Sequence, residues 1–157
     1  MNIDMLNSIF KDGVYKNTLM DFKLITLFEF QEKYPTSHVG GSIGLMLRGI
    51  DLGRNLSKSD LDITIDEYDF KEGDIEDLDL RSDFNDFDFC LVKKSDESMY
   101  VKIDIRVSPE PSFDVIEYKG VKYNVSKLRD IIFWKKNYAE KGVQKHINDL
   151  KVIKLIM

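Results

Sequence analysis

The sequence predicts an α+β domain in which helices flank a small mixed β-sheet. Three features of the chain lead to this class. Apolar residues recur at helical spacing near both ends. Short segments in the middle alternate apolar and polar residues, which is typical of half-buried strands. A glycine pair at 40–41 separates two strand-like segments and opens a brief helix, so strand, helix and strand follow one another closely.

The 157 residues suffice for one domain with a buried core, and we expect a single domain over 1–157. It would comprise N-terminal helices over 1–35, a core over 36–108, and a hairpin with C-terminal helices over 113–157. The sequence has no repeat, low-complexity tract or linker that would divide it.

Composition excludes several classes of protein. No apolar stretch is long enough to span a bilayer, and residues 1–13 lack the apolar core of a signal peptide. The single cysteine, Cys90, rules out an internal disulfide and a Cys-rich zinc site. We therefore expect a cytoplasmic protein that has no membrane association.

Charge is distributed unevenly along a chain whose net charge is -5. Residues 60–88 carry thirteen Asp and Glu against two Lys and Arg, whereas residues 119–157 carry ten Lys and Arg against three Asp and Glu. These segments are either solvated faces of opposite sign, or an acidic metal-binding wall and a basic wall with a polyanionic nucleotide between them. The acidic balance argues against general binding of duplex DNA.

Helices are expected first along the chain. Helical spacing predicts one helix over 3–10, with Gly13 as its stop, and a longer helix from about Tyr15 to Lys33 that ends before Pro35. The inward-facing residues of the longer helix would include Leu19, Phe22, Ile25 and Phe28.

Two strands are expected around the glycine turn, a short one over Thr36–Val39 and a longer one over Asp60–Asp66. An acidic surface loop to about Phe84 should follow the second strand.

Alternating residues then predict a strand around 87–91, a turn over Lys93–Ser98 and an antiparallel partner strand over Met99–Val107. A small hairpin that turns at Lys119–Gly120 should follow.

The C-terminal part is expected to be helical. Ser126 is a suitable N-cap for a helix through Tyr138, and Gly142 separates this helix from a last one. The last helix would contain Val143, Ile147, Leu150 and Ile153.

Asp60 and Asp62 are the first candidate functional residues. Strand side chains alternate, so both carboxylates point to one side while Leu61, Ile63 and Ile65 point into the core. Two adjacent carboxylates repel each other unless a cation lies between them, and Mg²⁺ prefers oxygen ligands of this kind.

The glycine turn supplies a complementary feature. Gly40 and Gly41 allow the backbone to approach a ligand closely, and amides at Ser42 and Ile43 would favour an anionic phosphate. Ser42 can also cap its own helix, and the two roles are compatible. A phosphate site beside a metal-binding carboxylate pair predicts phosphoryl or nucleotidyl transfer.

Asp104 is the candidate for the third carboxylate that a two-metal transferase needs. It lies mid-strand between Ile103 and Ile105, where a charge is costly without a metal or cationic partner. If its strand neighbours that of the aspartate pair, Asp104 can also take the proton from an incoming hydroxyl. The alternative is a charge at the sheet edge, paired with Arg106 or Lys102.

These residues together resemble the nucleotidyltransferase fold of the DNA polymerase beta superfamily. The matching motifs are Gly41-Ser42, Lys58-Ser59-Asp60-Leu61-Asp62-Ile63 and Ile103-Asp104-Ile105. The C-terminal part is similar to that of small stand-alone members, including the nucleotidyltransferase toxins of abortive-infection systems. The segments that carry this second likeness are Val121–Val125, the helix after Ser126, Lys145-His146 and Asp149-Leu150. The resemblance covers most of the chain from His38 onward.

The resemblance implies transfer of a nucleoside monophosphate from a nucleoside triphosphate to a hydroxyl on a small molecule, a protein or an RNA end. Mg²⁺ or Mn²⁺ would be held by the catalytic residues Asp60, Asp62 and Asp104. The predicted nucleotide-binding residues are Gly40, Gly41, Ser42, Arg54 and Lys145.

One departure from the family concerns spacing. Seventeen residues separate Ser42 from Asp60, more than in compact members, which leaves the positions of Arg54 and Lys58 open. For Arg54 and Lys145 a solvated surface position is the alternative. His38 and His146 are expected at a strand end and on a helix face, and Trp134 in the core or on a hydrophobic surface.

Two other functions are compatible with the sequence. Glu117-Tyr118-Lys119, with Asp104 or Asp114 upstream, resembles the acidic-residue-x-lysine end of restriction-type nuclease sites, although Lys119 should point to solvent from its hairpin turn. A catalytically silent nucleotidyltransferase fold, retained as a binding or regulatory module, is the second alternative.

Overall fold

The computed structural model describes residues 19–67, 69–70, 79–80, 89–94, 99–108 and 112–156. Five predictions lie wholly or partly outside these residues: the helix over 3–10, the first turn of the longer helix, most of the acidic loop, the start of the strand around 87–91, and most of the turn over Lys93–Ser98. No helix in the described ranges is long and apolar enough to cross a membrane.

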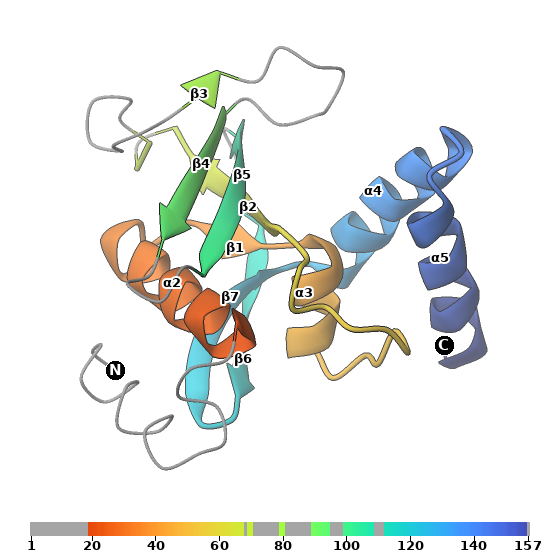
Figure 1. Ribbon diagram of the computed structural model, residues 1–157. Coiled ribbons are helices and arrows are strands. Elements are labelled where there is room, and N and C mark those ends of the chain that lie inside the picture. The colour runs from red at the N-terminus through yellow and green to blue at the C-terminus, as the bar shows by residue number, and fades with distance from the viewer. Residues whose placement is uncertain are drawn as a thin grey trace.

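The described strands form one mixed seven-stranded sheet in the order β3-β4-β5-β2-β1-β7-β6 (Figure 1). β2 runs parallel to β5 and β1 runs parallel to β7, whereas the other neighbours are antiparallel. The strands are β1 (His38–Val39), β2 (Leu61–Asp66), β3 (Asp79–Leu80), β4 (Phe89–Lys94), β5 (Tyr100–Ser108), β6 (Phe113–Tyr118) and β7 (Val121–Ser126).

Helices complete the α+β architecture that the sequence predicts. They are α2 (Leu19–Lys33), α3 (Gly41–Leu47), α4 (Leu128–Glu140) and α5 (Gln144–Ile156). α2 packs against β5 and β7, and α4 packs against both α3 and α5. In Figure 1, α4 and α5 lie side by side, with α3 between them and α2.

The two faces of the central strands differ in chemistry. On β2 and β5, alternate residues enter the core, and Leu61, Ile63, Ile103 and Ile105 are fully buried. The intervening residues pair across the parallel strands, Asp62 with Asp104 and Thr64 with Arg106. His38 on β1 lies opposite Thr64. One face therefore builds the core, and the other carries a row of polar side chains.

Several strand and turn predictions are confirmed with shifted ends. β5 begins one residue later than expected and pairs antiparallel with β4. The hairpin turns at Lys119 and Gly120, whose φ values of 50° and 80° give both the left-handed conformation that such a turn needs. β1 is two residues shorter than expected, because the amide and hydroxyl of Thr36 both donate to the Asp69 carboxylate.

Two strand boundaries were predicted wrongly. The expected loop after Asp66 contains β3, a two-residue strand that pairs with β4 at the edge of the sheet. β4 continues through Lys93 to Lys94, where the turn was expected to begin. A charged segment at a sheet edge has the composition of a loop, which is why these residues were assigned wrongly. Backbone hydrogen bonds to a neighbouring strand can nevertheless keep such a segment in a strand.

The prediction that Ser126 caps α4 is wrong. Ser126 is the last residue of β7, and the N-cap position belongs to Lys127, which makes no side-chain capping bond. The Ser126 hydroxyl instead lies 2.6 Å from Nδ1 of His38. Pairing with Phe113 holds Ser126 in the sheet, so its side chain serves a contact between strands.

The inward face of α2 also differs from the prediction. Phe28 is buried as expected, but Leu19, Phe22 and Ile25 are only partly buried. Leu24 and Leu27 occupy the centre of the interface, 1% and 0% exposed. The face is shifted because the helix also buries polar residues, including Lys23.

Lys23 joins α2 to the loop that precedes β2. Its ammonium donates to the backbone carbonyls of Leu56, Ser57 and Ser59, at 2.7 Å for Ser57, and the side chain is only 2% exposed. Burial lowers the pKa of Lys23 to about 8, while the charge of Asp60 opposes this shift. The lysine thus holds the end of the long connection to Asp60.

Lys23→Met is expected to destabilise the fold by about 2 kcal/mol, because loop carbonyls would lose a charged donor. Urea denaturation followed by circular dichroism measures the change. Lys33→Met, at an exposed position on the same helix, is the matched control and should stay within about 0.5 kcal/mol of the parent. Equal stability of the two variants would contradict a structural role for Lys23.

Candidate functional site

Three carboxylates, those of Asp60, Asp62 and Asp104, line one cavity at the polar face of the sheet. The register of β2 and β5 sets Asp62 directly beside Asp104, and Asp104 is 5% exposed. β5 lies between β4 and β2, so the alternative of a sheet-edge position for Asp104 is wrong. Lys102 Nζ lies 3.8 Å from an oxygen of Asp60 and 3.7 Å from an oxygen of Asp104. The two strands are therefore neighbours, which is the condition on which the proposed role of Asp104 depends.

The glycine turn lies against Asp62. The amide of Gly40 donates to the backbone carbonyl of Asp62 at 2.8 Å. Gly41 has a φ of +60°, and a Cβ atom placed on it would lie 2.3 Å from a carboxylate oxygen of Asp62. Only glycine therefore allows the Asp62 carboxylate to lie against the turn.

Asp62 carries a strongly perturbed carboxyl group. Burial raises the pKa of Asp62 to about 7, and the negative charges of Asp104 and Asp60 raise it further, against the opposing charges of Lys135 and Arg106. A carboxyl group that resists ionisation for these reasons would be stabilised in its charged form by an additional cation.

This shift makes the effect of Asp62→Asn depend on pH. Native Asp62 keeps its proton up to about pH 7, whereas the unfolded chain loses it near pH 3.8, so the parent loses stability as pH rises between these values. Asp62→Asn should therefore stabilise the protein more at pH 8 than at pH 5. The expected difference is about 3 kcal/mol, because each pH unit over which Asp62 titrates differently in the two states contributes about 1.4 kcal/mol.

Urea denaturation of the parent and of Asp62→Asn at both pH values tests this expectation. The difference between the two proteins isolates Asp62, because the histidines titrate in both. A gain that does not change between pH 5 and pH 8 would contradict the raised pKa of Asp62.

A buried ionic network lies behind the turn. The Ser42 hydroxyl accepts hydrogen bonds from Arg54 at 2.8 Å and from Lys135 at 3.1 Å. Both cations also donate to Asp149, and Lys135 and Asp149 are each 1% exposed. Lys135 Nζ further lies 3.2 Å from Nδ1 of His146. The network ties the turn to α4 and α5.

The predicted nucleotide-binding residues have different surroundings. Gly40, Gly41 and Ser42 lie at the turn, and Arg54 is not a solvated surface residue, because Ser42 and Asp149 engage its guanidinium. Lys145 on α5 is exposed, yet it lines a cavity together with the three aspartates.

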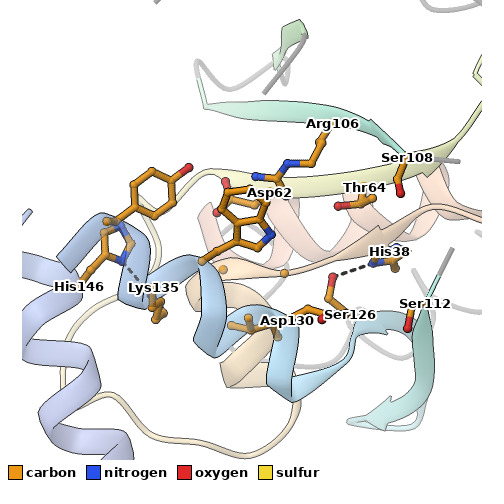
Figure 2. A pocket seen from close by; sticks show the side chains of 15 residues that line it. His38, Asp62, Thr64, Arg106, Ser108, Ser112, Ser126, Asp130, Lys135 and His146 are labelled. Atoms are coloured by element: carbon orange, nitrogen blue, oxygen red, sulfur yellow. Dashed lines mark hydrogen bonds between the residues drawn. The ribbon is translucent and has the colours of Figure 1, made fainter. Parts of the chain in front are cut away.

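Two neighbouring cavities make up the site. The acidic cavity, of about 230 Å³, is lined by Asp60, Asp62, Asp104, Lys102, Lys145 and Ser42, among others. The aromatic cavity, of about 200 Å³, is lined by His38, Thr64, Arg106, Ser126, Trp134 and Asp62, among others. Asp62, Tyr138 and His146 line both cavities. Figure 2 shows the aromatic cavity, with His38 and Ser126 at one end and Lys135 and His146 at the other.

Sequence reasoning missed several of these residues. Lys135, Tyr138 and Arg106 were not proposed as site residues, and His146 and Trp134 were assigned to a helix face and to core or surface. One local signal was present for Lys135, which follows Ile131 by four positions on the inward face of its helix. A lysine on such a face needs an acidic partner, here Asp149.

The donor atoms of the acidic cavity fit a hard divalent cation. Carboxylate oxygens are the ligands that Mg²⁺ and Mn²⁺ prefer, and the mutual repulsion at Asp62 is what such a cation relieves. Within the described part of the chain, no three His, Cys, Asp or Glu side chains lie close enough together to form a ready metal-binding group. The ammonium of Lys102 lies near both Asp60 and Asp104 and supplies positive charge there.

Comparison with known proteins gives no match, since no protein-family model, curated protein or solved structure matches this chain. The site is therefore interpreted from its own side chains.

Proposed function

We propose that this protein is a metal-dependent nucleotidyltransferase, which moves a nucleoside monophosphate from a nucleoside triphosphate to a hydroxyl of an RNA end, a protein or a small molecule. The observation that supports it most is the pairing of Asp62 with Asp104 on parallel strands, with the Asp62 carboxylate against the Gly41 turn. Asp62 lines both cavities, so the carboxylates proposed for a divalent cation in the acidic cavity adjoin the close-approach turn proposed for phosphates, which lines the aromatic cavity.

Asp60, Asp62 and Asp104 would hold Mg²⁺ or Mn²⁺. When bound, the metal supplies Lewis-acid activation of the reacting phosphate and neutralises the charge of the triphosphate. Burial, together with the negative charges of Asp104 and Asp60, raises the pKa of Asp62, and a bound cation would stabilise the ionised carboxylate.

The cationic side chains would bind and orient the triphosphate. Lys145 and Lys102 both line the acidic cavity, and each can contact a phosphate as a point charge. Arg54 has a different role in this proposal. Because Asp149 and Ser42 occupy its guanidinium, it positions the Ser42 hydroxyl and does not bind phosphate itself.

Asp104 would accept the proton of the incoming hydroxyl. It is nearly fully buried, and it lies beside Asp62, so an acceptor oxygen that reaches it also lies near the site of transfer.

A transfer assay tests the proposal. The full chain is incubated with each nucleoside triphosphate, Mg²⁺ and a cell extract, in two series labelled on the α- or the γ-phosphate. We expect a product that acquires the α-label and not the γ-label, and that is absent when Asp60→Ala replaces the parent. Transfer of the γ-label would indicate phosphoryl transfer, and absence of any labelled product would contradict transferase activity.

A catalytically silent binding module is the second candidate, and the contacts of Lys102 with two of the aspartates favour it. Binding of labelled nucleotide that requires Asp60 and Asp62, without transfer to any acceptor, would support the module. The nuclease alternative has less support. Exposed Glu117 lies on edge strand β6, four strands away from Asp104 on β5, and the other candidate, Asp114, is paired with Arg48 and Lys127. Cleavage of RNA or plasmid with Mg²⁺ alone would favour the nuclease alternative.

A further inference from the structure

The aromatic cavity contains a buried polar atom that the fold itself does not use. His38 is 5% exposed, and its Nε2 is buried without a hydrogen-bond partner. Its ring is held on two sides: Nδ1 lies 2.6 Å from the Ser126 hydroxyl, and the ring stacks on Phe113 at a centroid distance of 5.4 Å. The orientation of Nε2 is therefore set by the sheet before any ligand binds.

An unpaired buried nitrogen is costly to a fold, and His38 lines this cavity, so a ligand that pairs with Nε2 would remove the cost. Burial, helped by the positive charge of Arg106, lowers the pKa of His38 to about 4. The ring is thus neutral at physiological pH, and Nε2 can make one hydrogen bond to a neutral polar group. In a neutral ring only one nitrogen carries a proton. Nε2 is therefore a donor if Nδ1 accepts from the Ser126 hydroxyl, and an acceptor if Nδ1 donates to it.

Several side chains with planar groups line the aromatic cavity. The guanidinium carbon of Arg106 lies 3.9 Å from the ring centroid of Trp134, which gives a flat cationic and aromatic stack. Tyr138 and His146 stack at 4.9 Å where this cavity adjoins the acidic cavity. Planar side chains of this kind bind heteroaromatic rings by stacking.

Hydroxyl groups border the same space. Figure 2 shows Thr64 and Ser108 beside Arg106 on one side, and Ser126 and Ser112 on the other. These groups can hydrogen-bond to the edge of a planar ligand or to a sugar. Asp62 lies where the two cavities meet, so a molecule with phosphates in the acidic cavity would extend its remaining part into this one.

We propose that the aromatic cavity is the nucleobase pocket of the protein, and that His38 Nε2 hydrogen-bonds the edge of the base and so selects among nucleotides. This inference rests on the proposed transferase function. The inference assigns the pocket to the nucleotide and not to the hydroxyl acceptor. Side chains that stack on a ring, and one nitrogen in a fixed orientation, would bind a nucleobase in a single orientation.

Trp134 is the single tryptophan of the chain and lies in the wall of this pocket, so its fluorescence reports occupancy. The full chain is titrated in Mg²⁺ with the four nucleoside triphosphates and, separately, with inorganic tripolyphosphate. We expect at least one nucleotide to change the emission of Trp134 at saturation. Tripolyphosphate should displace that nucleotide while causing a smaller change of its own.

His38→Phe keeps an aromatic ring that can stack on Phe113 but removes both ring nitrogens, so the contact of Nδ1 with Ser126 is lost together with Nε2. It should weaken the preferred nucleotide at least about tenfold, reduce the preference among the four bases, and leave the affinity for tripolyphosphate unchanged. His38→Gln is the second variant, in case the first folds poorly, and circular dichroism checks both. Tyr123→Phe is the matched control: it removes another buried polar atom without a partner, from the opposite face of β7. Its base preference should equal that of the parent.

Two outcomes would overturn the inference. One leaves the proposed transferase function standing, and the other contradicts that function as well. If nucleotides bind and are displaced by tripolyphosphate, but both His38 variants keep the parental preference, the pocket does not read the base while the proposed function stands. If neither nucleotides nor tripolyphosphate bind, the base pocket and the proposed function both fail.

Discussion

Asp104→Asn is expected to abolish nucleotidyl transfer, with a fall in rate of at least about a thousandfold. The substitution preserves size but removes both a metal-ligating charge and the proposed proton acceptor. It also removes a charge that raises the pKa of Asp62, so the fold should remain intact and gain stability. Transfer of the α-label measures activity, and urea denaturation measures stability.

Glu117→Gln is the control for Asp104→Asn. It makes the same chemical change at an exposed position on β6, and it should transfer at the parental rate. Asp60→Ala should behave like Asp104→Asn, because both residues would ligate the metal. If Asp104→Asn transferred nucleotide as fast as the parent, the catalytic role of Asp104 would be wrong.

Asp149→Leu is expected to destabilise the protein by about 3–5 kcal/mol, the usual cost of removing one partner of a buried ion pair. Lys135 and Asp149 are each 1% exposed, with Nζ and carboxylate oxygen 2.9 Å apart. Burial alone would raise the pKa of Asp149, but hydrogen bonds from Arg54 and Lys135 lower it overall. The stability that Asp149 contributes should therefore be lost as pH falls through its lowered pKa.

The double variant Asp149→Leu/Lys135→Met distinguishes the destabilising effect of an unpaired charge from that of altered packing. It leaves no unpaired ammonium at position 135, so it should recover much of the stability that the single variant loses. Arg129→Met is the control on the same helix, because Arg129 is largely exposed and its pair with Asp130 at 3.9 Å should matter little. Thermal and urea denaturation of the four proteins measure the effects. A double variant no more stable than Asp149→Leu would show that packing, and not the unpaired charge, causes the loss.

The strands that carry the carboxylates were predictable because their pattern is local. In β2 and β5 a buried aliphatic residue alternates with a polar one, which indicates both the strand and the face on which Asp62 and Asp104 lie. The glycine turn was predictable for a similar reason, since two adjacent glycines mark a backbone that other residues avoid.

The contacts that hold the turn could not be predicted in the same way. Asp149 is separated by 95 positions from Arg54 and by 14 from Lys135, and His38 is 88 positions from Ser126. No local pattern specifies such partners. The failed prediction for Ser126 follows from this, because a serine before a helix resembles a cap until the neighbouring strand supplies a histidine.

The amino-acid sequence by itself determined which face of each strand is apolar, where the backbone needs glycine, and which carboxylates lie in the middle of strands. Only the tertiary structure decided that Asp62 and Asp104 are neighbours, that Arg54 supports Ser42, and that His38 lines a cavity while its Nε2 makes no hydrogen bond. The physical reason is that side-chain alternation depends on adjacent residues, whereas strand order and buried ion pairs depend on how distant segments pack together.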